Sequence, residues 1–93
     1  MPDSLTRRRF VVSGRVQGVG FRWVALRWAE ELGVRGWICN RDDGTVESEA
    51  EGGPRELAEF ERRLRAGPAG ARVDAVDVTE LKAEGKASSF EIL

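Results

Sequence analysis

The chain has 93 residues, which is too short for two hydrophobic cores and predicts a single domain. Its 41% apolar and 33% charged residues, with a net charge of −1, are typical of a soluble globular protein and exclude a disordered chain. No apolar run approaches the ~20 residues of a membrane span, and residues 1–6 lack the apolar stretch of a secretory signal. We therefore expect a cytoplasmic protein with no membrane partner.

The chain contains one cysteine, Cys39, and no histidine. A single cysteine permits no internal disulfide, which suits a reducing compartment. The absence of histidine removes the commonest general base, the commonest zinc ligand and every Ser-His or Cys-His nucleophile. Any catalysis by this chain must therefore proceed without imidazole.

Opposite charges are concentrated in the two halves of the chain. Residues 1–41 carry 8 basic and 3 acidic side chains, whereas residues 42–93 carry 7 basic and 13 acidic ones. The first half is thus net positive and the second half net negative. An anionic ligand would be attracted to the first half.

The first predicted element is a strand over residues 8–13, which are rich in aromatic and β-branched side chains and precede Gly14. An amphipathic helix is predicted over residues 21–32, because the apolar side chains there follow the i, i+3, i+4, i+7 spacing of one helical face. Gly33 suits the left-handed residue that commonly follows the end of a helix.

Residues 34–40 and 45–51 are short extended runs, and together they predict a hairpin with its turn at Asp42-Asp43-Gly44. Three acidic residues of the second run alternate with smaller or apolar ones, which places the acids on the outward side of the strand. These outward acids are Glu47, Glu49 and Glu51.

A second helix is predicted to begin at Pro54, since proline is tolerated at the first helical position, and to end before Gly67-Pro68. Residues 73–81 then predict another strand. The polar residues 82–87 are expected to form a loop, after which residues 90–93 could add a short closing strand or pair with a sheet edge.

The predicted order β-α-β-β-α-β is that of an α+β, ferredoxin-like sandwich, in which two helices cover one face of an antiparallel sheet. Residues 1–6 would be a flexible N-terminal extension. A right-handed crossover makes the first two strands parallel. Their carboxyl ends then meet at one edge, which brings together residues 14–20, the helix start at residues 21–22, and Asn40.

Residues 14–22 join a strand to a helix through a glycine-rich stretch. In this setting successive backbone N–H groups and the helix dipole can cradle a phosphate. The spacing fits neither a Walker loop nor a dinucleotide fingerprint. The alternative is a tight turn that needs glycine only for its positive φ angles.

Arg22 and Asn40 are the candidate functional side chains at this edge. Arg22 falls in the first helical turn, where a cation is disfavoured unless a bound anion reverses the local field; the alternative is an exposed arginine paired with a surface carboxylate. The Asn40 amide could hold a water in line with a phosphorus atom, or it could be a turn residue that bonds the nearby backbone.

Tryptophan side chains and the basic run Arg7–Arg9 raise the alternative of a single-stranded nucleic-acid binder. The first strand lacks the aromatic pattern of such a platform and the chain is net acidic, so we expect no nucleic-acid partner. Trp28 lies on the apolar helix stripe and is expected in the core, with Trp23 partly exposed. Cys39 is expected on the opposite face to Asn40, as a small buried hydrophobic residue.

Three segments closely resemble the acylphosphatase family: residues 14–22 (GRVQGVGFR), 36–40 (GWICN) and 43–47 (DGTVE). The resemblance extends to residues 90–92 and so covers nearly the whole chain, as an acylphosphatase-like domain over residues 7–93. It implies a ferredoxin-like fold, hydrolysis of acyl phosphates to a carboxylate and phosphate, and no metal or organic cofactor.

The resemblance also implies residue roles. The phosphate-binding arginine of the family falls on Arg22 and its water-orienting asparagine on Asn40. The phosphate cradle of the family corresponds to the backbone amides of Arg15, Val16, Gln17, Gly18, Val19 and Gly20.

An acyl phosphate already carries a carboxylate leaving group, so a site without histidine can suffice and the substrate phosphate would accept the proton of the water. We therefore expect a monomer that acts on a small-molecule acyl phosphate. The alternative is an acylphosphatase-like module that holds an anionic ligand without turning it over.

Overall fold

The computed structural model describes residues 4–93, so residues 1–3 of the predicted N-terminal extension lie outside the described residues. The elements follow the predicted order and add a short last strand. They are β1 (Thr6–Arg15), α1 (Phe21–Leu32), β2 (Arg35–Asn40), β3 (Val46–Gly52), α2 (Pro54–Ala66), β4 (Arg72–Leu81) and β5 (Phe90–Ile92). β1 begins within the predicted extension, because Thr6 already pairs with Gly52 of β3.

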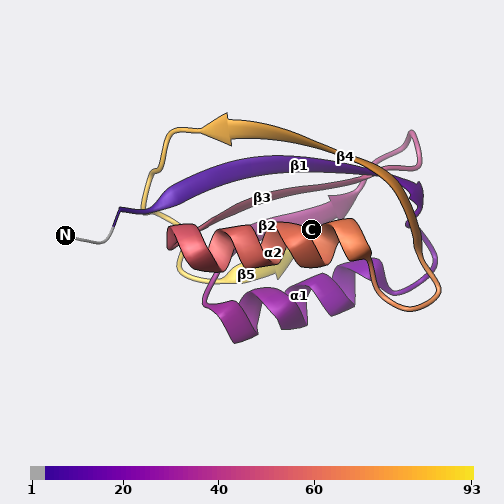
Figure 1. Ribbon diagram of the computed structural model, residues 1–93, viewed down its shortest axis with the longest axis horizontal. Coiled ribbons are helices and arrows are strands. Elements are labelled where there is room, and N and C mark those ends of the chain that lie inside the picture. The colour runs from indigo at the N-terminus through magenta and orange to yellow at the C-terminus, as the bar shows by residue number, and fades with distance from the viewer. Residues whose placement is uncertain (1–3) are drawn as a thin grey trace.

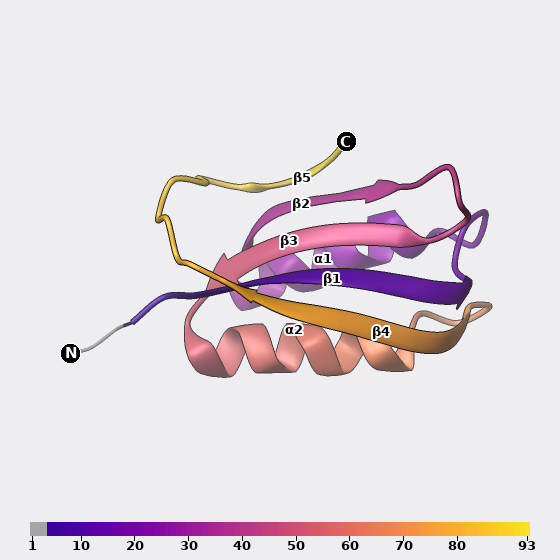
Figure 2. The same cartoon turned by 90° about the horizontal axis from the view of Figure 1, so that it is seen from above.

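The five strands form one sheet in the order β4-β1-β3-β2-β5. β1 pairs antiparallel with both β3 and β4, and β2 pairs antiparallel with β3, as predicted. The prediction of a wholly antiparallel sheet is wrong at β5, which pairs parallel to β2 with Phe90 opposite Gly36. The reason is the connection over residues 82–89, which brings the chain to the end of the sheet where β2 begins (Figure 2). The sheet is therefore mixed.

Both helices lie on one face of the sheet (Figure 1), as the sequence pattern predicted. Gly33 caps the carboxyl end of α1 with a left-handed φ of 71°, and the amide of Val34 donates to the carbonyl of Ala29 at 2.9 Å. α2 begins with Pro54 in its first turn. Within residues 4–93, neither helix has the length and apolar character needed to cross a membrane.

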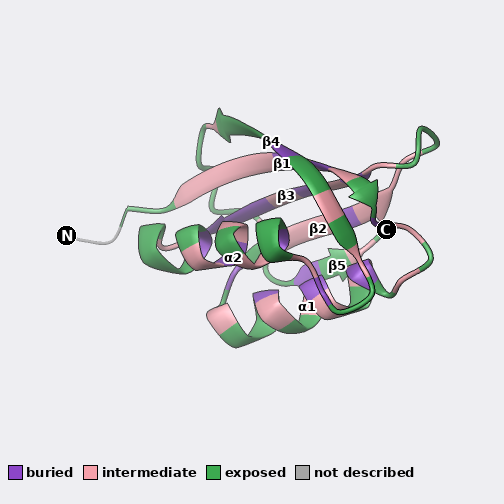
Figure 3. Cartoon of the chain, turned by 45° about the vertical axis from the view of Figure 1, so that its right-hand side comes forward, coloured by how far each residue is buried: buried purple, intermediate pink, exposed green. Residues whose placement is uncertain are grey.

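The core lies between the helices and the sheet, where the inward sides of both helices are buried (Figure 3). Phe60 of α2 is fully buried at its centre. Its ring makes edge-on contacts with Phe10 of β1 and Phe90 of β5, at centroid distances of 6.1 and 5.6 Å. One side chain of α2 thus contacts an inner strand and an edge strand of the sheet.

Two predictions about burial need correction. Cys39 is half-exposed and not buried, because β2 turns this side chain to the sheet face that carries no helix. Trp28 is half-buried and packs against the rim of the core, whereas Trp23 is 66% exposed, as expected for a side chain off the apolar stripe.

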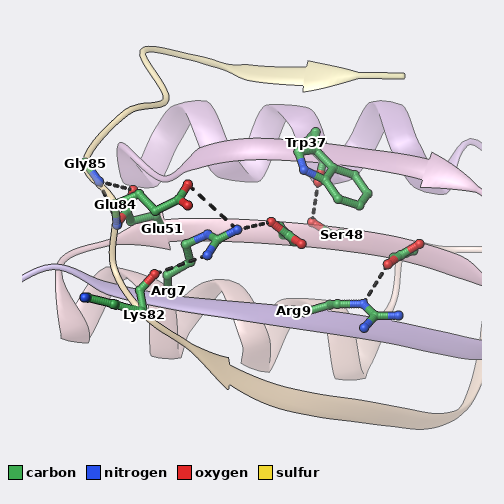
Figure 4. Close-up of polar contacts among 10 residues, drawn as sticks. Arg7, Arg9, Trp37, Ser48, Glu51, Lys82, Glu84 and Gly85 are labelled. Carbon is green, nitrogen blue, oxygen red and sulfur yellow. Dashed lines mark hydrogen bonds and ion pairs between the residues drawn. The ribbon is translucent and has the colours of Figure 1, made fainter.

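Glu51 lies on the outward face of β3, as predicted, but it is 7% exposed. The connection between β4 and β5 crosses over it (Figure 4). Its carboxylate accepts hydrogen bonds from the amides of Glu84 at 2.6 Å and Gly85 at 3.0 Å. Local alternation predicted the direction of this side chain and could not predict the distant segment that covers it.

Candidate functional site

The loop after β1, the start of α1 and the end of β2 lie at one end of the sheet, as the right-handed crossover predicts. The loop of residues 16–20 leaves β1, the start of α1 follows it, and the turn after β2 lies at the same end of the molecule (Figures 1 and 2). β1 and β2 both run antiparallel to β3, and so they are parallel to each other as expected.

Two glycines set the conformation of the loop. Gly18 and Gly20 have φ angles of 74° and 78°, while Val19 between them does not have a positive φ. Alternating handedness of this kind turns successive N–H groups toward a common side and forms an anion-binding concavity. An added Cβ at either glycine would meet no atom within 4 Å, so glycine is needed there for its backbone freedom and not for space.

The start of α1 carries an uncompensated positive potential. Gly20 is its N-cap, no side chain caps the first amides, and the first turn contains no acidic residue. Arg22 adds a cation in that turn. It is half-buried and makes no ion pair with any of residues 4–93, which argues against the alternative of a surface arginine held by a carboxylate.

Asn40 is the last residue of β2. Its Oδ1 atom is buried and accepts no hydrogen bond from the part of the chain that the structure describes. Buried acceptors almost always have a partner, so this oxygen is available to a donor from outside the chain. The alternative role as a turn residue falls to Asp43, whose carboxylate accepts hydrogen bonds from the amide and the hydroxyl of Thr45.

The side chain of Gln17 joins the loop to the turn that follows Asn40. Its Nε2 atom donates to the carbonyl of Arg41 at 2.7 Å and to the carbonyl of Thr45 at 3.0 Å. Sequence reasoning counted Gln17 only for its backbone amide and missed this link. The sequence carries no signal for it, because the two acceptors are backbone carbonyls 24 and 28 residues away.

Electrostatics also connect α1 to the end of β2. Burial and the carboxylate of Glu47 raise the pKa of the Cys39 thiol, while the cations Arg41 and Arg22 act in the opposite direction. The field of Arg22 therefore reaches the residue next to Asn40. Asn40 and Arg41 also line an open hollow at the surface together with Asp42 and Asp43.

The profile of the acylphosphatase family matches residues 8–92 of this chain, which include the loop, Arg22 and Asn40. The chain belongs to the acylphosphatase family. An acylphosphatase from Koribacter versatilis is 44% identical over 92 residues, covering 99% of this chain and 84% of the relative. One from Anaeromyxobacter dehalogenans is 48% identical over 86 residues, 92% of each chain. The acylphosphatase structure from Bacillus subtilis matches with a TM-score of 0.91 at 38% identity, covering 97% of this chain and 99% of that one.

These matches confirm the predicted family, the ferredoxin-like fold and the enzyme class, an acylphosphatase. They span both helices and all the strands that build the site. The geometry adds what the family membership does not state: Gln17 ties the loop to the turn after Asn40, and the Oδ1 of Asn40 has no partner within residues 4–93.

Proposed function

We propose that this chain hydrolyses the carboxyl-phosphate bond of acyl phosphates to a carboxylate and inorganic phosphate. The backbone amides of residues 15–20, which we call the phosphate cradle, hold the phosphoryl group together with Arg22. Asn40 orients the attacking water. The observation that carries the proposal is the buried Oδ1 of Asn40, which has no hydrogen-bond partner among residues 4–93. It lies one residue from the turn to which the side chain of Gln17 ties the cradle.

The first step is phosphate binding. The alternating loop conformation and the uncapped start of α1 present N–H donors to the phosphoryl oxygens. Arg22 brings a planar guanidinium that can donate two parallel hydrogen bonds to an oxyanion. These donors also stabilise the charge that develops on the phosphoryl oxygens in the transition state.

The second step is attack by water. The Oδ1 of Asn40 accepts a hydrogen bond from the water, which directs an oxygen lone pair at phosphorus on the side opposite to the leaving carboxylate. This in-line geometry is the main contribution of Asn40, because holding the reactants in place removes most of the entropic barrier to their meeting.

Bond making and breaking need no acid or base from the protein. The water oxygen forms a bond to phosphorus as the bond from phosphorus to the acyl oxygen breaks, and that electron pair leaves on the carboxylate. A carboxylate is a stable anion, so no general acid is required. The proton of the water passes to a phosphoryl oxygen of the substrate. An alkyl phosphate monoester, whose leaving alkoxide is far more basic, should therefore turn over much more slowly.

The proposed site binds the phosphoryl group and makes few contacts with the acyl group, since the cradle consists of backbone amides. We therefore propose a broad range of acyl phosphates as substrates. Neither the binding step nor the attack calls for a metal ion or an organic cofactor, so turnover should persist in a chelator.

The test is hydrolysis of a simple aromatic acyl phosphate, with and without a chelator, by the native chain and by Arg22→Ala and Asn40→Ala. We expect kcat/KM to fall by roughly 100-fold or more in each variant. The control is Arg27→Ala, which removes an exposed arginine of the same helix and should leave turnover unchanged. Circular dichroism checks that each variant is folded.

Two results would count against the proposal. Loss of turnover in the chelator would show that a metal takes part. Binding of inorganic phosphate by the native chain without any turnover would favour the alternative of an anion-binding module.

We also propose a monomer that does not bind nucleic acid. Four large apolar side chains of residues 4–93 are exposed, and they come from separate segments of the chain: Leu5, Trp23, Val78 and Leu93. The basic run is neutralised: Arg7 pairs with Glu49, Arg9 with Glu47, and Arg8 with Glu61 and Glu80. Size-exclusion chromatography tests the monomer, and the cytoplasmic location stays a prediction from the sequence.

A further inference from the structure

We propose that Gln17 is a positioning residue: its side-chain amide sets the distance between the phosphate cradle and Asn40. The inference rests on the proposed function and goes beyond it, because it assigns a role to a side chain that touches neither the phosphate nor the water. The one amide group spans two segments that are 24 and 28 residues apart from it in sequence.

The side-chain amide of Gln17 donates both of its hydrogens. Its Nε2 atom has two hydrogens, and the structure uses them on two acceptors, Arg41 at 2.7 Å and Thr45 at 3.0 Å. Both distances are those of good hydrogen bonds. The two carbonyls belong to the opposite sides of the turn between β2 and β3, so the amide grips both sides at once.

The turn that Gln17 binds is held by its own backbone hydrogen bonds. The carbonyl of Thr45 also accepts from the amide of Arg41 at 2.9 Å, and the carbonyl of Arg41 accepts from the amide of Gly44 at 3.1 Å. Gln17 therefore binds the rigid, hydrogen-bonded part of the turn. Asn40 precedes Arg41 directly, so the backbone of Asn40 moves with the point that Gln17 holds.

The sheet itself does not hold the loop and the turn together. β1 and β2 are separated by β3. At this end of the sheet their pairing with β3 stops at Val46, the first residue of β3, which lies opposite Val12 of β1 and Asn40 of β2. Beyond Val12, β1 pairs only with β4. No backbone ladder therefore fixes the loop against the turn, and the Gln17 side chain supplies that connection.

The link matters for chemistry because in-line attack depends on the distance from the water oxygen to phosphorus. A misplacement of about 1 Å can lower a rate by about 100-fold. Phosphate binding depends on the cradle amides and on Arg22, which stay on one segment when the link is lost. Removing the link should therefore lower kcat and leave phosphate affinity nearly unchanged.

The test is Gln17→Met, which keeps the length of the side chain and removes both donors. We expect kcat to fall roughly 10- to 100-fold, with a change of less than about threefold in the inhibition constant of inorganic phosphate. The matched control is Ser48→Ala, which removes a 2.7 Å hydrogen bond from Ser48 to the carbonyl of Trp37 between the same two strands. It should lower Tm and retain kcat.

A double-mutant cycle with Asn40→Ala tests whether Gln17 acts through Asn40. If it does, Gln17→Met should lower the native rate strongly and change the residual rate of Asn40→Ala little. Equal losses in both backgrounds would overturn the inference, as would a rise in the phosphate inhibition constant that matches the loss of activity. If the native chain turns over substrate and Gln17→Met is equally active, the positioning role of Gln17 is wrong and the proposed function stands. If the native chain shows no turnover, the proposed function and the positioning role both fail.

Gln17→Glu is the second variant, in case Gln17→Met does not fold. Its charged carboxylate can only accept, so the link is broken at neutral pH, but its protonated form can donate to one of the two carbonyls. The kcat of Gln17→Glu relative to the native chain should therefore rise as the pH falls toward the ordinary glutamate pKa of about 4.3. A ratio independent of pH would contradict the positioning role.

Discussion

Gly18 occupies a backbone conformation that other residues adopt only at a cost, and it does so without any steric neighbour. Its φ is 74°, and a Cβ there would meet no atom within 4 Å. The cost of any other residue is therefore conformational. At the scale of single residues, the proposed site depends on glycines that would shape the phosphate cradle and on Asn40, whose Oδ1 has no hydrogen-bond partner within residues 4–93.

The prediction at this scale is Gly18→Ala. We expect the free energy of unfolding to fall by about 1 kcal/mol, because alanine is strained in the left-handed region. We also expect the inhibition constant of inorganic phosphate to rise about fivefold or more, since relief of the strain would turn the cradle amides away. Urea unfolding and phosphate inhibition of hydrolysis measure the two effects.

Gly70 provides the control for this prediction. It lies in the connection between α2 and β4, its φ is 88°, and a Cβ there would also meet no atom within 4 Å. Gly70→Ala should lower stability by a similar amount and leave phosphate inhibition unchanged. Similar inhibition constants for the two variants would show that Gly18 does not shape the cradle.

At the scale of elements, β5 depends on the segment that delivers it. The connection over residues 82–89 crosses the sheet end and is held there by side chains of the sheet's outward face (Figure 4). The buried carboxylate of Glu51 accepts the amides of Glu84 and Gly85, and Arg7 donates to the carbonyl of Lys82 at 3.1 Å. Glu51 lies in β3, and it anchors β5 by holding the connection that leads to that strand.

The prediction for this element is Glu51→Gln. The substitution keeps the shape and removes the charge that strengthens two hydrogen bonds, so we expect stability to fall by about 1–3 kcal/mol. Glu49→Gln is the control, because Glu49 is partly exposed and pairs with Arg7 near the surface; it should cost less than about 1 kcal/mol. Equal losses in urea unfolding would argue against Glu51 as the anchor.

At the scale of the whole molecule, one buried ring couples three elements. Phe60 of α2 contacts Phe10 of β1 and Phe90 of β5, so a helix, an inner strand and an edge strand meet at one side chain. A domain of this size has few such centres, and the loss of one should be felt throughout.

Phe60→Ala tests this coupling. We expect a loss of about 3–5 kcal/mol, which lowers Tm by more than roughly 10 °C in a domain of this size. Far-UV and near-UV circular dichroism should still report one shared transition. Separate transitions would show that α2 and the sheet edge unfold independently.

Periodicity and glycine placement were enough to predict both helices and the first four strands, since the pattern of a helix or strand is written within a dozen neighbouring residues. The segment GRVQGVGFR and the position of Asn40 were enough to predict where the candidate site lies, because chain connectivity restricts the topology. The direction of β5, the burial of Glu51 and the exposure of Cys39 were not predictable in this way.

The direction of β5 and the burial of Glu51 depend on a segment far away in the chain, and the exposure of Cys39 depends on which face of the sheet the helices leave uncovered. Glu51 is buried by residues more than 30 positions later, and Gln17 binds carbonyls more than 20 positions later. Backbone carbonyls and amides are present at every residue, so the sequence does not mark which of them a distant side chain will reach. The sequence by itself therefore determined the elements, the family and the candidate residues. Only the tertiary structure decided which of their atoms are paired and which, like the Oδ1 of Asn40, have no partner within residues 4–93.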